Sequence, residues 1–134
     1  MDRKQVMEML NKKPRIGTLS TCDKNGNVNV AVFGSPKMVD ENTIIMGIGQ
    51  NRSFKNLKEN PKAVFIVMEP GPTAPEWKGA RVYLEVKAIE DTGPFFDEVI
   101  EGVVKVAGEG ARKMLKAAVR FEIKEIRPIL APGD

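Results

Sequence analysis

The sequence predicts a mainly β domain of the α+β class, a small antiparallel β-barrel with short helices at its periphery. Two features of the chain support this prediction. Most apolar segments either alternate with polar residues or form short continuous runs, as β-strands do. Short turns, rather than helices, connect most of these segments. Parallel strands need a long crossover connection, so a doubly wound parallel sheet is disfavoured.

Length and composition indicate one globular domain over residues 1–134. Hydrophobic residues make up 42% and charged residues 29% of the chain, which is the usual mixture for a folded domain. The net charge of +3 is small, and acidic residues are interleaved with the basic ones, so we expect no nucleic-acid partner. No apolar run approaches the roughly 20 residues of a transmembrane helix, and the N-terminus lacks the apolar part of a signal peptide. We therefore expect a cytoplasmic protein without a membrane partner.

The chain has one cysteine and no histidine, which restricts its chemistry. A zinc site of the His/Cys type is disfavoured, and we expect no metal. Histidine acid–base catalysis and histidine ligation of haem are excluded. Cys22 has no histidine to activate it, so we interpret it as a small, half-buried apolar residue rather than a nucleophile. The sequence assigns no catalytic residue.

Helical spacing and turn residues define the first half of the chain. An N-terminal helix follows Asp2, a suitable N-cap, and ends before Pro14. Asn25 and Gly26 form the strongest short hairpin signal, and Pro36 interrupts the chain after the hairpin. The predicted strands are residues 15–21, 28–34 and 43–49, with extended chain at 37–39.

The second half contains a short helix, a longer helix, a helical turn and three strands, one of which follows a long loop. The short helix is predicted over residues 53–60, with Phe54 and Leu57 facing inward and Pro61 after its end. The continuous apolar run at 63–68 is typical of a strand covered on both faces. The remaining predicted elements are a loop at 69–79, a strand at 80–90, a helix at 95–107, a helical turn at 111–117, a strand at 118–126 and a tail from Pro128.

The polar segment "GQNRSFKNLKENP" is a candidate anion site, because it enters the short helix with a hydroxyl and several cations. The first N–H groups of a helix lack partners within the helix and carry partial positive charge. Arg52, Ser53 and Lys55 would suit a phosphate placed there. The alternative is that Ser53 is a plain N-cap while the cations face water. Spacing alone favours this alternative.

Two further segments allow a similar choice between a structural and a binding role. In "VAVFGS" the residues Asn29, Ala31 and Phe33 share one strand face, which is either core or a platform for a flat ring. Trp77, in the loop rich in proline and glycine, either covers the core or anchors a ligand or subunit contact. Neither glycine-rich segment indicates a nucleotide-binding loop. "GIGQNR" lacks the third glycine of a dinucleotide fingerprint. "GEGARK" follows a helix rather than a strand, so it is better explained as the end of that helix and a turn.

Taken together, these segments resemble the pyridoxamine 5′-phosphate oxidase-like family of FMN-binding split barrels, and most closely its short single-domain FMN-binding proteins. The resemblance runs from about Ile16 to Ile126. Its landmarks are "IGTLSTCDKNGNVNVAVFGSP", "IIMGIGQNRSFKNLKENPKAVFIV" and "GARVYLEVKAIED". The second landmark is the most specific, and its matching residues are Arg52, Ser53, Asn56, Leu57, Asn60 and Pro61.

The resemblance implies a six-stranded split barrel, a homodimer, and FMN in each of two clefts at the dimer interface. Arg52 and Ser53 would hold the FMN phosphate, with Asn51 and Lys55 nearby. The other residues that the resemblance places around FMN are Ala31, Val32 and Phe33 along the isoalloxazine, Gly47, Ile48 and Gly49 at the rim, and Trp77 as a cap from the partner subunit.

The chain also departs from the oxidase after which the family is named. That enzyme uses an Arg-x-His pair near its last strand for its substrate, whereas this chain has Arg120-Phe121-Glu122. Oxidation of pyridoxamine phosphate is therefore not expected, and neither is haem degradation through a histidine ligand. The remaining hypotheses are an FMN-dependent oxidoreductase or electron carrier, a deazaflavin- or FAD-binding reductase of the same fold, and a ligand-free interaction module.

Overall fold

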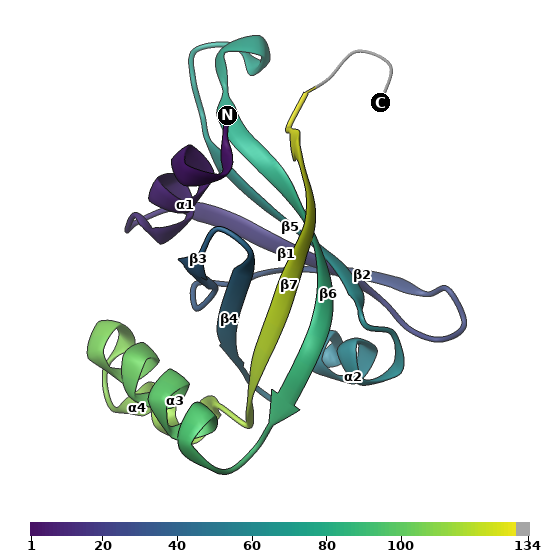
Figure 1. The fold of residues 1–134 in the computed structure, drawn as a ribbon, viewed down its shortest axis with the longest axis vertical. Coiled ribbons are helices and arrows are strands. Elements are labelled where there is room, and N and C mark those ends of the chain that lie inside the picture. Colours follow the sequence, from purple (N-terminus) through teal and green to yellow (C-terminus); the bar gives the residue numbers. More distant parts are fainter. Residues whose placement is uncertain (131–134) are drawn as a thin grey trace.

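One strongly twisted antiparallel sheet forms the body of the protein (Figure 1). The computed structural model describes residues 1–130, and within them the sheet has seven strands in the order β2-β1-β5-β6-β7-β4-β3. The strands are β1 (Ile16–Cys22), β2 (Val28–Val32), β3 (Lys37–Asp40), β4 (Thr43–Ile48), β5 (Lys62–Glu69), β6 (Lys78–Glu90) and β7 (Ala117–Pro128). All neighbouring strands pair antiparallel, so the predicted fold class is confirmed, although the expected count of six strands was one too low.

Short helices lie around the sheet, as predicted (Figure 1). They are α1 (Arg3–Asn11), α2 (Arg52–Glu59), the 3-10 helix η1 (Ala74–Glu76), α3 (Pro94–Ala107) and α4 (Gly110–Met114). Asp2 caps α1: its carboxylate accepts from the Gln5 backbone N–H, while the Gln5 side chain accepts from the Asp2 backbone N–H. The predicted N-cap of the first helix is thus confirmed.

The β1–β2 hairpin turns at the predicted Asn-Gly pair. Gly26 has a φ of +87°, a conformation that glycine adopts without steric cost. The Asp23 carboxylate accepts hydrogen bonds from the backbone N–H groups of Asn25 and Asn27 and from the Asn27 side chain. The loop is therefore closed by its own polar residues, and it carries strand β2 back along β1 at the edge of the sheet.

The core lies on one face of the twisted sheet, where α1 covers part of it. Its largest fully buried side chains come from six strands and one helix: Phe65, Phe121, Leu10, Leu19, Met38, Ile44, Met46, Ile48, Val6, Val67, Val82 and Val119. Phe54 and Leu57 of α2 also point into this core, as predicted. The buried Asn56 donates to the hydroxyl of Thr21 across 3.0 Å, which fixes α2 against β1.

The opposite face of β1, β2 and β5 is not covered within one chain. Val28, Val30 and Val32 of β2 are 81%, 63% and 77% exposed. On β5 the alternate residues Val64, Ile66 and Met68 are only half-buried. The prediction that this strand is covered on both faces is therefore wrong for the single chain. We call these six residues the valine face.

The end of β7 differs from the sequence-based boundary, whereas the end of α3 agrees with it. Strand β7 continues to Pro128, where the sequence indicated the start of a tail, and residues 131–134 of that tail lie outside the described residues. Gly108, with a φ of +90°, ends α3 as predicted. No helix within residues 1–130 is long and apolar enough to cross a membrane.

Candidate functional site

The start of α2 is built differently from the sequence-based interpretation. Asn51, not Ser53, is the N-cap: its side-chain oxygen accepts from the backbone N–H of Phe54 at 2.9 Å. Ser53 is the second residue of the helix and is 1% exposed. The cap leaves the backbone N–H groups of Arg52 and Ser53 without partners inside the helix. These two groups are the ones that an anion at the helix start would accept from.

Ser53 meets a residue that the sequence analysis did not place in the site. Asn29 of β2 donates from Nδ2 to Oγ of Ser53 at 3.2 Å. The signal was present, because the alternation of β2 puts Asn29 on the same face as Ala31 and Phe33, and all three are half-buried. This hydrogen bond joins β2, which we predicted to lie along a flat ring, to the start of α2, which we predicted to hold a phosphate.

The cations around this point are not equivalent. Lys55 lies 3.0 Å from Glu59, and this hydrogen-bonded pair holds the pKa of Glu59 below its usual range. Lys58 lies over the ring of Phe54, 4.3 Å from its centroid. Arg52 is exposed and makes no ion pair within residues 1–130. The guanidinium of Arg52 is therefore the cation most available to a phosphate at the helix start.

The predicted glycine rim has a packing role. A Cβ on Gly47 would lie 3.1 Å from the side chain of Leu115, and one on Gly49 would lie 2.7 Å from the carbonyl oxygen of Met114. Ile48 between them is 1% exposed, and its carbonyl accepts from the backbone N–H of Lys116. The close approach of the chain after α4 thus explains both glycines, and their contact with a cofactor stays a prediction.

The end of β2 is linked to this rim. The hydroxyl of Ser35 donates to the carbonyl oxygen of Gly47 at 2.7 Å. Phe33 is half-buried and packs against the core, while Val32 points outward and is 77% exposed. The structure therefore links the segment from Asn29 to Ser35 to the start of α2 through Asn29 and to the rim through Ser35.

Trp77 is the one predicted cofactor residue that lies away from the start of α2 within a single chain. It follows η1 in the β5–β6 connection and is 38% exposed. Helix α2 leads into the start of β5 (Figure 1), whereas Trp77 follows in the connection after the end of β5, and β5 itself is about 25 Å long. Contact with a ligand at α2 would require Trp77 of a partner subunit.

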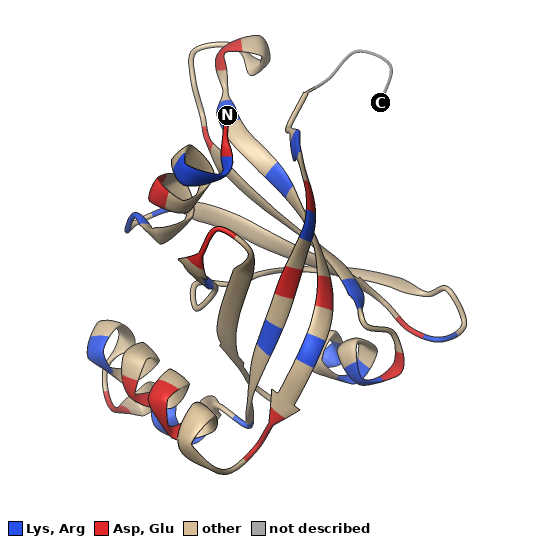
Figure 2. Cartoon of the chain, viewed as in Figure 1, with Lys and Arg blue, Asp and Glu red and all other residues tan. Residues whose placement is uncertain are grey.

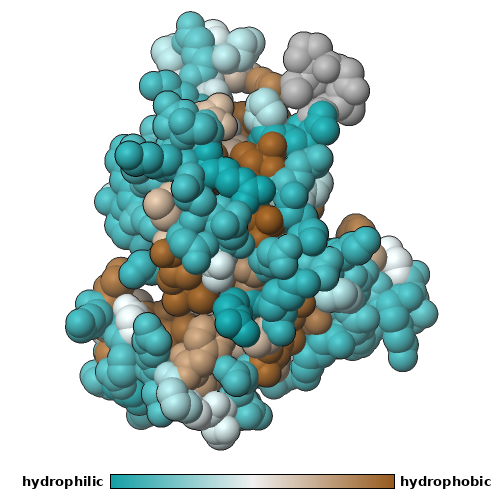
Figure 3. All heavy atoms as spheres, viewed as in Figure 1, coloured by the Kyte–Doolittle hydropathy of each residue, from teal (hydrophilic) through white to brown (hydrophobic). Residues whose placement is uncertain are grey.

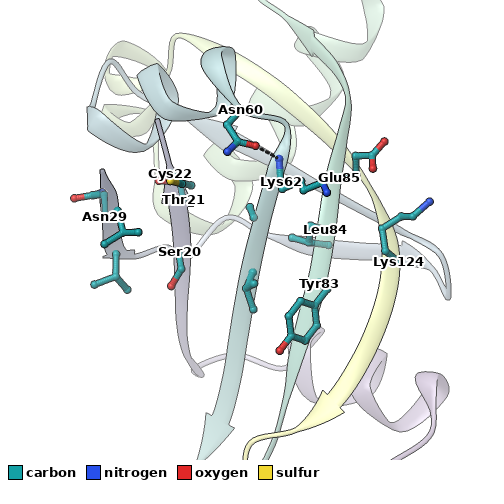
Figure 4. Close-up of a pocket in the computed structure, with 14 residues that line it drawn as sticks. Ser20, Thr21, Cys22, Asn29, Asn60, Lys62, Tyr83, Leu84, Glu85 and Lys124 are labelled. Atoms are coloured by element: carbon teal, nitrogen blue, oxygen red, sulfur yellow. Dashed lines mark hydrogen bonds between the residues drawn. The ribbon is translucent and has the colours of Figure 1, made fainter. Parts of the chain in front are cut away.

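A shallow groove of about 720 Å³ runs over the outer face of β1, β5 and β6, beside α2 (Figure 4). Its lining includes Val28 and Val30 of the valine face, together with Asn29 and Tyr83. None of the predicted cofactor residues lines the groove. It belongs to the uncovered outer surface and touches the candidate site only through Asn29.

Comparison with known proteins settles the family. The model of the pyridoxamine 5′-phosphate oxidase family matches residues 3–129, nearly the whole chain. The chain belongs to this family. An FMN-binding protein from Syntrophomonas wolfei subsp. wolfei is 30% identical, with a TM-score of 0.83 over 96% of this chain and 86% of that one. A search of curated proteins finds no match.

Solved structures of lower sequence identity share the fold. HupZ from Group A Streptococcus is 15% identical, with a TM-score of 0.77 over 96% of this chain and 94% of that one. The haem storage protein HutZ from Vibrio cholerae is 17% identical, with a TM-score of 0.71 over 96% of this chain and 95% of that one.

This member of the pyridoxamine 5′-phosphate oxidase family uses its Arg120-Phe121-Glu122 segment for internal contacts. Glu122 lies 2.9 Å from Lys124 and 3.6 Å from Lys87, and these pairs hold the pKa of Glu122 below its usual range. Arg120 lies over the ring of Phe95, 5.9 Å from its centroid. Basic and acidic residues alternate along β6 and β7 in the same region (Figure 2).

Proposed function

We propose that this protein is an FMN-binding flavoprotein, an oxidoreductase or electron carrier, with FMN held at a homodimer interface. One observation carries the proposal: the first two residues of α2 supply a guanidinium with no ion pair within residues 1–130, a buried hydroxyl and two backbone N–H groups. This donor set fits a phosphate monoester, which carries about −1.5 to −2 charges and three acceptor oxygens. The 30% identical relative described as an FMN-binding protein supports FMN as the phosphate-bearing ligand.

Different residues would bind the phosphate and the ring of FMN. Arg52 and Ser53 would hold the phosphate, and Asn51 would fix the helix start that presents them, with Lys55 adding charge nearby. The backbone of Ala31, Val32 and Phe33 would bind the isoalloxazine, and the chain at Gly47–Gly49 would bind the ring or the ribityl group. When bound, the flavin supplies the redox chemistry, and the protein supplies position and control of access.

The valine face supports the proposed homodimer. Its six side chains form an apolar surface on β2 and β5 that solvent would otherwise contact. Contiguous apolar surface of this kind typically marks a protein interface. A second copy of the chain would cover this surface.

The visible absorption spectrum of the purified protein tests the proposal. We expect flavin absorption, or its appearance after FMN is added to a colourless preparation. Mass measurement of the extracted ligand separates FMN from FAD and from a deazaflavin. A protein that is colourless and does not bind added FMN contradicts the proposal. Reduction by NADH or NADPH, followed by a screen of acceptors, then distinguishes an oxidoreductase from a one-electron carrier.

A further inference from the structure

Arg15, just before β1, donates to backbone carbonyls of two separate segments. Its Nε donates to the carbonyl of Leu10 at 2.6 Å, near the end of α1. Its Nη1 donates to the carbonyl of Phe33 at 3.0 Å, and its Nη2 donates to the carbonyls of Pro36 at 2.7 Å and, more weakly, Gly34 at 3.4 Å. The four bonds use both arms and the Nε of one guanidinium, a planar arrangement that a lysine side chain cannot reproduce.

The ring of Phe65 holds the guanidinium of Arg15 in place on its other side. Arg15 lies over the ring of the fully buried Phe65, 5.1 Å from its centroid. A Cβ on Gly17 would lie 2.9 Å from Nη1 of Arg15 and closer still to the Phe65 ring. Glycine at position 17 therefore leaves the space that the stacked pair occupies. Such close packing on a buried ring gives Arg15 little freedom to move.

Arg15 thereby fixes the turn that follows the proposed flavin-binding strand. The turn runs from Phe33 to Pro36, and Lys13 adds a bond from Nζ to the carbonyl of Gly34 at 2.6 Å. From the same turn, Ser35 donates to the carbonyl of Gly47. One guanidinium thus sets the turn, and the turn sets the distance between the end of β2 and the rim at Gly47.

We infer that Arg15 is a positioning residue for the flavin ring, acting through the turn at 33–36 rather than by contact with the ligand. The inference rests on the proposed function. Backbone groups bind a flat ring well only when the chain that carries them is held in place before binding. Loss of the bonds from Arg15 to these carbonyls should weaken the binding of the ring and leave the proposed phosphate site at Arg52 intact.

The test compares Arg15→Lys with Arg3→Lys, measuring dissociation constants for FMN and riboflavin well below the melting temperature. Arg3 is a matched control, because it also joins α1 to a distant turn, donating to the carbonyl of Glu41 and to the side chain of Asn42. We expect Arg15→Lys to weaken both ligands about tenfold, since roughly one charge-assisted bond to each carbonyl is lost or bent. The ratio of FMN to riboflavin affinity should stay unchanged, and the visible circular dichroism of bound flavin should change. Arg3→Lys should alter neither affinity.

Ser35→Ala is a second variant that removes only the link from the turn to Gly47, and it should weaken both flavins in the same direction. Unchanged affinities in a folded Arg15→Lys and in Ser35→Ala overturn the inference while leaving the proposed function in place. A loss confined to FMN also overturns it, because the effect would then lie at the phosphate. A wild-type protein that binds neither flavin overturns the proposed function itself, and this inference with it.

Discussion

Asn29 on β2 donates a hydrogen bond from Nδ2 to Oγ of Ser53 on α2, across 3.2 Å. A hydroxyl has one hydrogen to donate and two lone pairs that accept. Because Asn29 occupies an acceptor position, the hydrogen of the buried Ser53 hydroxyl would be available to a phosphate at the helix start under the proposed function. The bond therefore couples the edge strand to the start of α2, where we propose that the phosphate binds.

The first prediction concerns this coupling. Asn29→Ala and Ser53→Ala should each weaken FMN binding by about 1 kcal/mol, and the double variant should lose less than the sum of the two. Calorimetric titration of the four proteins completes the cycle. Strictly additive losses would show that the bond plays no part in holding the phosphate.

Arg52 is expected to recognise the phosphate group itself. Arg52→Ala should weaken FMN by about 10- to 100-fold, because charge-assisted bonds are worth about 1.5–3 kcal/mol, and should leave riboflavin binding unchanged. Lys58→Ala on the same helix is the control and should bind both ligands normally, since Lys58 lies over Phe54. Equal losses for FMN and riboflavin in the Arg52 variant would contradict the assigned role.

The close packing of the chain just after β4 against the backbone at Met114 should require glycine at position 49. In Gly49→Ala the new methyl group would meet a backbone oxygen at 2.7 Å, so we expect a loss of about 1–3 kcal/mol in the free energy of unfolding. Gly102→Ala, within α3 and with open space around the new Cβ, should instead gain about 0.5–1 kcal/mol. Urea denaturation of both variants measures the difference. A Gly49→Ala protein as stable as wild type would show that the chain near Met114 moves freely.

The hairpin turn gives a pH prediction. The hydrogen bonds from the side chain and backbone of Asn27, followed by that from Asn25, lower the pKa of Asp23. A carboxylate with a lowered pKa stabilises the fold above its unfolded pKa of about 3.9, and this stabilisation is lost as the pH falls through the folded value. Asp23→Asn should therefore flatten the dependence of the free energy of unfolding on pH below about pH 4. An unchanged acid profile would argue against these bonds in solution.

The valine face should hold two chains together. Val30→Asp places a charge in the middle of β2 and should convert the proposed dimer into a monomer in sedimentation experiments. Val106→Asp is the control, because Val106 is 72% exposed on α3, away from β2 and β5. Figure 3 shows that apolar residues also reach the surface elsewhere, so the control separates a specific interface from general apolar exposure. Dissociation by both variants would place the interface elsewhere.

The sequence predicted the elements whose signals are local. The cap at Asp2, the turn at Asn25-Gly26 and the end of α3 at Gly108 depend on neighbouring residues, and all three were correct. The cap of α2 was assigned to the wrong residue, because Asn51 and Ser53 are both good N-caps and only backbone geometry distinguishes them.

Long-range contacts could not be predicted in this way. Gly49 was placed at the rim of the cofactor site, and nothing in the sequence indicated that its backbone also lies against Met114, far along the chain. The clamp of Arg15 on Phe33 and Pro36 left no pattern in the sequence. An apolar run such as 63–68 cannot reveal whether its second face is covered by the same chain or by a partner.

The length of β5 has a thermodynamic consequence. It separates the start of α2 from Trp77 within one chain, so under the proposed arrangement each flavin is held by two subunits. Cofactor binding and subunit association are then linked equilibria: FMN tightens the dimer by the same factor by which dimerisation tightens FMN. Dilution of the protein would thus release flavin as well as monomer, and a full supply of FMN would keep the protein assembled.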